Sequence, residues 1–307
     1  MTRGRDLRTT ISAREPRVPA LRAAWDPKRV RFIDGPHGEA IPVRCYGTSR
    51  RRRPVIICHG LQSHSGWFLQ STMHLAEHDH PAYAMDRMGS GLSSAPRGHC
   101  RSLTEWLDEI DMVLREAMRT HDHDDCFVLG HGFGAILATA YACRYPDRVS
   151  GLIAVTPVIH ARVDLPIGTR LAIRWQRWTD PLRSYPLPME ARQISQDPDF
   201  IDFVQSDPLA LRAATAGLYS AAVQARRFIH QQADELTVPV LVQLAGTDPL
   251  VDQERTRRLL QRAPAAMKEV RNYPDARHII EFGPQRERFL GDLVDWLDRA
   301  ERHLDGA

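Results

Sequence analysis

Residues 126–145 read CFVLGHGFGAILATAYACRY, and this stretch decides the fold. It opens with a short apolar run, passes through a glycine-rich segment and continues with apolar residues at helical spacing as far as Pro146. A short apolar run is typical of a strand buried on both faces, and a proline ends the helix that precedes it. The stretch therefore predicts a buried strand over residues 126–129, a tight turn, and a helix over residues 133–145.

The same alternation of strand and helix extends outward in both directions from this unit. Strands are expected at residues 29–34 and 40–45 (an opening hairpin), 54–58, 82–86, 149–156, 238–244 and 267–273, and helices at residues 67–79, 102–120, 253–262 and 284–303. Strands that alternate with helices of this length imply a mostly parallel sheet that is covered on both faces. The predicted fold class is α/β, with a mostly parallel central sheet flanked by helices.

One stretch, residues 157–237, interrupts the alternation. It contains no comparable strand, and its helical pieces are expected at residues 171–178, 199–204 and 209–228. An insertion ahead of the last strands of a regular sheet is a natural cap or lid. We therefore expect an N-terminal extension over residues 1–28, a core made of residues 29–156 and 238–307, and a mainly helical cap over residues 157–237.

Composition and charge exclude several classes of protein. Of the 307 residues, 43% are hydrophobic and 26% are charged, as in ordinary globular proteins. The chain has no apolar run near the ~18 residues of a membrane span, and its N-terminus lacks the apolar segment of a secretory signal. The 41 basic and 38 acidic residues leave a net charge of +3, and the basic runs lack interleaved aromatic residues. We expect a cytoplasmic protein that neither binds nucleic acid nor integrates into a membrane.

The sequence predicts neither a disulfide framework nor a metal or cofactor site. The cysteines are Cys45, Cys58, Cys100, Cys126 and Cys143, an odd number without C-x-x-C spacing. This pattern indicates reduced thiols. The run His121-Asp122-His123-Asp124-Asp125 could suggest a metal, but it precedes a strand, at the end opposite to the expected site. We interpret it as a solvated loop.

The candidates for chemistry are the residues that follow each strand, because open parallel sheets place their sites at the carboxyl ends of the strands. These are His59-Gly60-Leu61-Gln62, the segment from Asp86 to Ser93, the turn at residues 130–134, Asp248 and His278. In this order the motifs resemble the α/β-hydrolase family, in its monoacylglycerol lipase and lysophospholipase-like branch. The resemblance covers roughly residues 29–304 and implies the α/β-hydrolase fold.

The resemblance also implies a role for each position. Asp248 is the expected acid and His278 the expected base, while the backbone N–H groups of Leu61 and Phe133 form the expected oxyanion hole. Asp86 is interpreted as a structural anchor for its turn. The candidates for the wall of the substrate pocket are His59 and His131, which are expected to support the loop and the turn, and Trp175, Trp178, Tyr185 and Phe203, which could instead pack the cap on the sheet.

One position departs from the family pattern. The nucleophile elbow of a serine hydrolase reads Gly-x-Ser-x-Gly, whereas residues 130–134 read Gly-His-Gly-Phe-Gly, with Gly132 at the centre. Glycine adopts the strained elbow conformation without steric cost, but without a hydroxyl it cannot form an acyl-enzyme. The alternatives for a relocated nucleophile are Ser63, Ser65, Ser90 and Ser93, whereas Cys58 is expected in the core.

The turn also fits a second motif, the dinucleotide fingerprint, as Gly130-x-Gly132-x-x-Ala135. That motif requires an acidic residue at the end of the next strand, about twenty residues further on. The next strand, residues 149–156, continues as Pro-Val-Ile-His with no carboxylate. The sequence therefore argues against a dinucleotide site.

Three functions remain open. The first is an enzyme that binds a largely apolar small molecule with a carbonyl or ester group beneath the cap. In it His278, oriented by Asp248, acts as general base, either in water-activated hydrolysis or in a lyase or cyclisation step of secondary metabolism. The second is an ordinary carboxylesterase or monoacylglycerol lipase-like hydrolase, engineered into an inactive variant by placing Gly132 where its serine stood. The third is a non-catalytic protein that kept the fold and binds a ligand.

Overall fold

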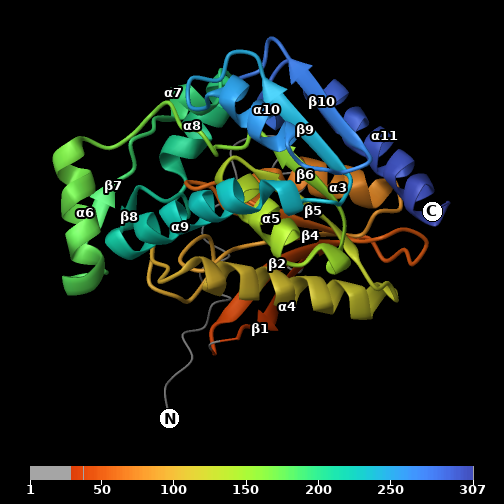
Figure 1. The fold of residues 1–307 in the computed structure, drawn as a ribbon, viewed down its shortest axis with the longest axis horizontal. Coiled ribbons are helices and arrows are strands. Elements are labelled where there is room, and N and C mark those ends of the chain that lie inside the picture. The colour runs from red at the N-terminus through yellow and green to blue at the C-terminus, as the bar shows by residue number, and fades with distance from the viewer. Residues whose placement is uncertain (1–28, 37, 307) are drawn as a thin grey trace.

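Eight strands form one sheet at the centre of the molecule (Figure 1). The computed structural model describes residues 29–36 and 38–306, so the expected N-terminal extension lies outside the described residues. The strands of this sheet are β1 (Val30–Asp34), β2 (Ala40–Tyr46), β3 (Val55–Cys58), β4 (Ala82–Met85), β5 (Cys126–His131), β6 (Val149–Val155), β9 (Val240–Ala245) and β10 (Lys268–Tyr273). Their order is β1-β2-β4-β3-β5-β6-β9-β10, parallel from β4 to β10, with β1 and β2 antiparallel at one edge. The predicted α/β class is confirmed.

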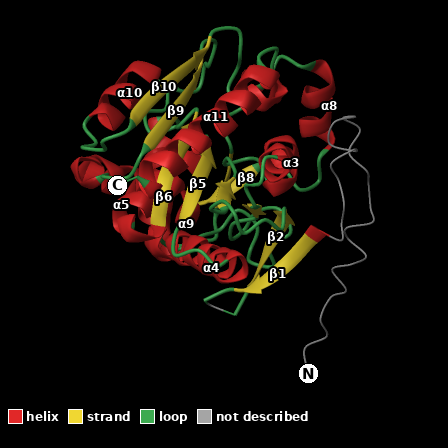
Figure 2. Ribbon diagram, turned by 90° about the vertical axis from the view of Figure 1, so that its right-hand side faces the viewer, coloured by secondary structure: helices red, strands yellow, loops and turns green. Residues whose placement is uncertain are grey.

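Helices cover both faces of this sheet. The α-helices are α3 (Leu69–Glu77), α4 (Leu103–His121), α5 (Phe133–Arg144), α6 (Ile167–Thr179), α7 (Ala191–Ile194), α8 (Pro198–Ser206), α9 (Ala216–Gln232), α10 (Gln253–Gln261) and α11 (Arg286–Asp305), and the 3₁₀ turns are η2 (Ser65–Phe68), η3 (Pro146–Arg148), η4 (Ala233–Glu235) and η5 (Ile280–Phe282). Figure 2 shows α4 and α5 on one side of the strands and α3 and α11 on the other. Within the described residues, no helix is both long enough and apolar enough to cross a membrane.

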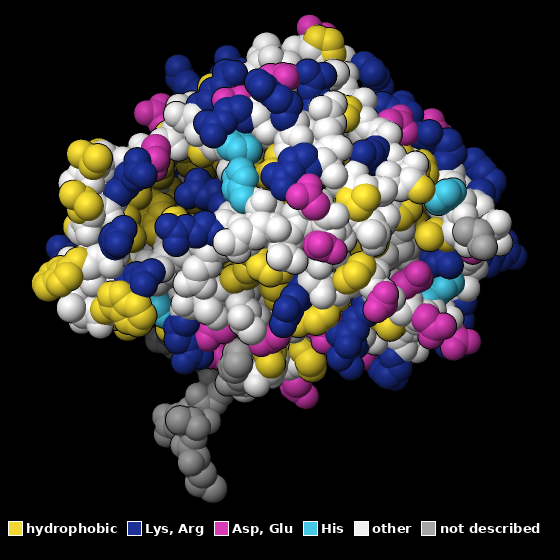
Figure 3. Space-filling model, viewed as in Figure 1, with side chains coloured by type: hydrophobic (Ala, Val, Ile, Leu, Met, Phe, Trp, Pro, Cys, Tyr) yellow, Lys and Arg dark blue, Asp and Glu magenta, His cyan; other side chains and the backbone are white. Residues whose placement is uncertain are grey.

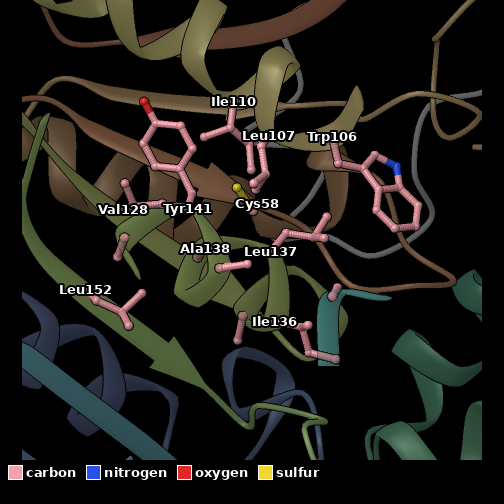
Figure 4. Close-up of a cluster of buried hydrophobic side chains, with 14 of the residues drawn as sticks. Cys58, Trp106, Leu107, Ile110, Val128, Ile136, Leu137, Ala138, Tyr141 and Leu152 are labelled. Atoms are coloured by element: carbon pink, nitrogen blue, oxygen red, sulfur yellow. The ribbon is translucent and has the colours of Figure 1, made fainter. Parts of the chain in front are cut away.

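The core between the sheet and helices α4 and α5 explains the sequence of α5. Every residue from Phe133 to Cys143 is buried, so this helix is apolar on all sides rather than amphipathic. Figure 4 shows side chains of α4, α5 and the sheet strands packed together there. Cys58, at the end of β3, belongs to this cluster, and burial raises the pKa of its thiol to about 12. The prediction that Cys58 is a core residue is confirmed, and its thiol stays protonated.

The predicted elements of the sheet and its flanking helices are all present, with ends within two residues of the expected ones. Strands buried on both faces form continuous apolar runs in the sequence, which makes them easy to recognise. The helix predicted from residue 67 begins as the 3₁₀ turn η2 and continues as α3. All five cysteines are free and buried, as expected of reduced thiols.

The segment between β6 and β9 differs from its prediction in several respects. Helix α6 begins at Ile167, four residues before the helix expected over residues 171–178, and α7 has no counterpart among the expected helices. The segment holds helices α6 to α9, but it also contains a hairpin of two three-residue strands, β7 (Ser184–Pro186) and β8 (Ala213–Thr215). The helix predicted over residues 209–228 therefore begins only at Ala216. The hydroxyl of Thr215 accepts a hydrogen bond from the N–H of Leu218 and so fixes this start as an N-cap.

Candidate active site

His278 and Asp248 form a buried pair at the carboxyl edge of the sheet. Asp248 follows β9 and His278 follows β10, and these strands are parallel neighbours. The Nδ1–H of His278 donates a hydrogen bond of 2.8 Å to Oδ2 of Asp248, whose Oδ1 accepts from the N–H of Leu250 at 2.8 Å. Because a carboxylate only accepts, the ring proton is assigned to Nδ1, which leaves Nε2 as an acceptor.

The Nε2 atom of His278 faces Gly132. Gly132 lies between β5 and α5 with φ +55° and ψ −109°, a conformation that residues other than glycine rarely adopt. A Cβ atom placed on Gly132 would lie 2.8 Å from Nε2 of His278. Any side chain at position 132 would therefore point at the ring and would have to displace it slightly.

The loop that follows β3 is held by His59 and Arg87. The Nδ1–H of His59 donates to the carbonyl oxygen of Gly60 at 2.8 Å, and its Nε2 accepts from the N–H of Arg87 at 3.3 Å. Burial and the charge of Arg87 hold the pKa of His59 well below its usual value, so the ring is neutral. The guanidinium of Arg87 donates to the carbonyl oxygens of Gly60 and Leu61 at 3.2 and 2.7 Å. His59 thus supports the loop and does not line either of the cavities beside His278.

The turn after β4 is anchored by Asp86, as the sequence predicts. Its Oδ1 accepts from the N–H and the hydroxyl of Ser65 at 2.7 and 2.5 Å, and its Oδ2 accepts from the N–H of Leu92 at 2.8 Å. Burial alone would raise the pKa of this carboxyl. The charge of Arg44, 3.6 Å away, acts together with the neighbouring histidines and the hydrogen bond from Ser65 to outweigh burial and hold the pKa at about 2. Asp86 therefore ties the segment after β3 to the segment after β4.

Two cavities meet at His278. The smaller has about 350 Å³ of empty volume and is lined by Gln62, Ser63, Trp67, His131, Gly132 and Thr156, among others. The larger has about 870 Å³, counting open solvent at its mouth, and is mostly apolar, with Phe133, Ile136, Val158, Leu218, Tyr219 and Leu250 in its wall. Leu61, Met189 and His278 line both cavities. The predicted oxyanion residues Leu61 and Phe133 thus share the wall of the larger cavity with His278.

Three buried polar atoms in the wall of the smaller cavity have no hydrogen-bond partner among the described residues. They are Oε1 of Gln62, Oγ of Ser63 and Nε2 of His131. Burial lowers the pKa of His131 to about 3, and its ring stacks on Phe68 at 4.0 Å, so this histidine is neutral. A buried polar group without a partner costs about 1–3 kcal/mol. The smaller cavity is therefore suited to a small polar group.

Three of the four serines considered as substitute nucleophiles are bonded to other groups. Ser65 donates to Asp86, Ser90 accepts from Arg87, and Ser93 accepts from two backbone N–H groups at 3.3 Å. Ser63 lines the smaller cavity but forms no hydrogen bond with His278.

The aromatic residues expected in the pocket wall lie elsewhere. Trp175 and Trp178 are 67% and 77% exposed on the outside of α6, and neither lines a cavity beside His278. Tyr185 donates to Gln176 of α6, and Phe203 packs edge-on against Trp67 at 6.0 Å. Of the two alternatives, the expectation that these residues line the pocket is therefore corrected, and Phe203 packs within the core instead. The residues of this segment that do line the larger cavity, and that sequence reasoning missed, include Val163, Met189, Leu218, Tyr219, Ala222 and Arg226.

The His-Asp run before β5 is only partly a solvated loop. His121 ends α4 and is buried, and its Nε2 lies 2.9 Å from the hydroxyl of Tyr83. Asp122 follows with φ +61° and closes the helix. In the described part of the chain, no group of three or more His, Cys, Asp or Glu side chains is placed to hold a metal ion.

Comparisons with known proteins agree with this architecture. The sequence model of the family described as "Serine aminopeptidase, S33" matches residues 49–285. The chain is 25% identical over 250 residues to a monoacylglycerol lipase of Mycolicibacterium smegmatis, covering 80% of this chain and 88% of that protein. It is 27% identical over 259 residues to the phospholipase YtpA of Bacillus subtilis, covering 78% of this chain and 94% of that protein.

Solved structures show the same similarity. The crystal structure of a monoacylglycerol lipase from Paleococcus ferrophilus superposes with a TM-score of 0.78 at 25% sequence identity, covering 85% of this chain and 99% of that one. The fold, the order of the strand-end motifs and these matches agree. The chain therefore belongs to the α/β-hydrolase family described by the S33 model, in its monoacylglycerol lipase-like branch.

Proposed function

We propose that this lipase- and esterase-like enzyme hydrolyses an ester of a largely apolar small molecule without a covalent acyl-enzyme, with His278 as general base. One observation carries the proposal. The His278 ring is oriented by Asp248 through Nδ1, and its free Nε2 faces Gly132, where no hydroxyl can act as nucleophile. The attacking oxygen must then come from another molecule, and water is the simplest source.

The reaction balances with the groups present. Nε2 of His278 takes a proton from water while the water oxygen bonds to the carbonyl carbon. The backbone N–H groups of Leu61 and Phe133 stabilise the resulting oxyanion, because the first N–H groups of a helix such as α5 lack intrahelical acceptors. When the intermediate collapses, the bond to the leaving oxygen breaks and that oxygen takes the proton from His278. Asp248 holds the ring in the required tautomer and stabilises the transient imidazolium.

The smaller cavity favours hydrolysis over a lyase or cyclisation step. Gln62, Ser63 and His131 line a space that His278 also borders, and each of the three has a buried polar atom without a hydrogen-bond partner among the described residues. A water molecule in this space would lie next to the base. A lyase or cyclisation reaction needs no second polar reactant at this position.

The substrate body is assigned to the larger cavity. Its wall is mostly apolar and includes His278, Leu61 and Phe133, so a bound chain would bring its carbonyl to the base and the oxyanion donors. The segment between β6 and β9 supplies much of this wall, which supports its role as the cap over the site.

Hydrolysis of p-nitrophenyl butyrate tests the proposal. We expect slow turnover without an initial burst, and a loss of about 100-fold or more in His278→Ala and Asp248→Asn, since general-base catalysis contributes 10²–10⁴. His303→Ala, on the exposed end of α11, is the matched control and keeps the native rate. An unchanged rate in His278→Ala would refute the general-base role. Fluorophosphonate labelling of the native protein, at Ser63 for instance, would refute the absence of an acyl-enzyme.

A second candidate function is supported by the same geometry. The turn keeps a positive φ at Gly132, and a side chain there would aim at His278, as in an intact serine hydrolase. An ordinary esterase whose serine had been replaced by glycine would show this arrangement. The gene sequence at codon 132 in the source organism distinguishes the two. Tight ligand binding without any product, unaffected by Asp248→Asn, would instead indicate a non-catalytic binding protein.

A further inference from the structure

A single arginine interrupts the apolar wall of the larger cavity. Leu218, Ala222 and Arg226 occur at every fourth position of α9, so they share one face of the helix, and all three line the cavity. Arg226 is half-buried, and its guanidinium forms no hydrogen bond or ion pair with any residue that the structure describes. The cavity therefore has His278 in one part of its wall and an unpaired cation in another.

The one acidic residue in the same wall does not neutralise Arg226. Asp164 lines the cavity, but its carboxylate is paired with Nη1 of Arg170 at 3.1 Å. Burial lowers the pKa of Arg226, Asp164 opposes this effect, and the charge of Arg170 adds to it. A charged group held in partly apolar surroundings without a partner is costly, so this position is suited to an anion.

Two histidine rings near Arg226 are neutral and leave its charge unbalanced. His160 and His230 lie edge to face with ring centroids 4.9 Å apart. Burial lowers the pKa of both rings, and the charges of Arg226 and Arg255 lower it further. Figure 3 shows Lys and Arg groups around a hollow beside α6 whose interior is apolar, as expected for the mouth of this cavity.

We propose that the substrate carries an anionic group, a carboxylate or a phosphate, that binds the guanidinium of Arg226 while the apolar body fills the cavity. The inference deepens the proposed function, because it gives the ester presented to His278 a charged second end. A guanidinium binds carboxylate and phosphate oxygens through two parallel N–H bonds, which adds geometric specificity to charge. A neutral ester of the same size would leave Arg226 without a partner and bind more weakly.

Binding rather than turnover tests this inference, so that it stands or falls separately from the chemistry at His278. Decanoate, decyl phosphate and decanol are titrated by calorimetry below their aggregation concentrations, into the native protein and into His278→Ala. We expect at least one anion to bind ten-fold or more tighter than decanol to both proteins. The anion that binds more tightly, decanoate or decyl phosphate, shows whether the anionic group of the substrate is a carboxylate or a phosphate.

Variants on α9 localise the effect. Arg226→Gln should abolish the preference for the anion over decanol without weakening the binding of decanol, and Arg226→Lys should keep part of the preference. Arg227→Gln changes the exposed neighbour, which does not line the cavity, and should leave all three affinities unchanged. Thermal unfolding confirms that each variant is folded. If Arg226→Gln does not fold, Arg226→Lys is tested in its place. Equal binding of anion and alcohol by the native protein, or a full preference in Arg226→Gln, would overturn the inference.

Discussion

The hydroxyl of Thr156 donates a hydrogen bond of 3.0 Å to the carbonyl oxygen of His278. Thr156 follows β6, lines the smaller cavity and has φ +43°, which is rare for a β-branched residue. Residues held in such conformations cluster at functional sites, where the surrounding structure fixes them. Thr156 thus joins the end of β6 to the segment that carries the proposed base, and we regard it as a positioning residue.

Thr156→Val removes this hydroxyl and keeps the shape of the side chain. We expect the unfolding free energy to fall by about 1 kcal/mol, the typical value of one hydrogen bond. We also expect a lower kcat with little change in KM, because the His278 backbone loses a restraint. Steady-state kinetics and urea unfolding measure both effects. Thr156→Ser keeps the hydroxyl and should restore kcat; equal rates in the two variants would contradict the positioning role.

Arg87 fixes the loop that carries the proposed oxyanion donor. Arg87→Met leaves the carbonyl oxygen of Leu61 without its buried donor and that of Gly60 with His59 alone, so we expect a loss of about 3 kcal/mol in stability. The amide of Leu61 would lose its orientation, and kcat should fall more than KM rises. Chemical denaturation and kinetics at 25 °C test this. Arg87→Lys retains a charge, so its stability and kcat should lie between those of the native protein and those of Arg87→Met. Native kinetics in both variants would contradict the role of Arg87 in fixing the loop.

Gly132→Ser should restore a nucleophile at a cost in stability. The positive φ and the contact of a Cβ with His278 together predict a loss of about 1–3 kcal/mol. The variant should react covalently with a fluorophosphonate probe, detected by mass spectrometry. Gly132→Ala carries the same strain without the hydroxyl, so it should lose the same stability and remain unlabelled. Failure of the folded serine variant to label would show that His278 and the oxyanion donors are not arranged for acyl transfer.

Glu281 should make stability depend on pH. Its carboxyl is fully buried and accepts from the N–H and hydroxyl of Ser71, and burial raises its pKa from 4.5 to about 7. Between these values the folded state holds a proton that the unfolded state has released. The contribution of Glu281 to the unfolding free energy is therefore fully present below pH 4.5 and is lost as the pH rises through 7.

Urea unfolding at pH 5 and pH 8 tests this pH dependence. Glu281→Gln cannot ionise, so the loss of stability between the two pH values should be smaller in this variant than in the native protein. Glu77→Gln, exposed at the end of α3, should behave as the native protein does. Equal losses in Glu281→Gln and the native protein would contradict the assignment.

The central strands β3, β4, β5, β6 and β9 could be predicted because they are buried and mostly apolar, whereas β7 and β8 could not. Each of these strands has only three residues and no alternation, so neither differs from a loop in sequence. The helical spacing of residues 209–215 continues into α9, so the sequence predicts one helix from residue 209. In the structure Thr215 is the N-cap of α9, and the residues just before it pair with β7 as strand β8.

The candidate site divides in the same way. His278 and Asp248 could be predicted from their places after β10 and β9, because parallel strands bring their carboxyl ends together. Arg226 could not, because arginines are frequent in this chain and helical position alone does not show which one faces a cavity. For Trp175 and Trp178 the sequence leaves open a place in the pocket wall or packing of the cap on the sheet, whereas α6 exposes both side chains. Hydrophobic side chains do occur on protein surfaces.

Because all five free cysteines are buried, their reaction with a thiol reagent would measure how often the protein opens. A thiol reagent such as Ellman's compound reacts only with an accessible thiolate, so the native state should stay silent toward it. Each equivalent of coloured product released then shows that one thiol has become accessible in an opened conformation. The time course of this reaction without denaturant would give the rate at which the protein opens. Thiols on different elements would give the opening rate of each element separately.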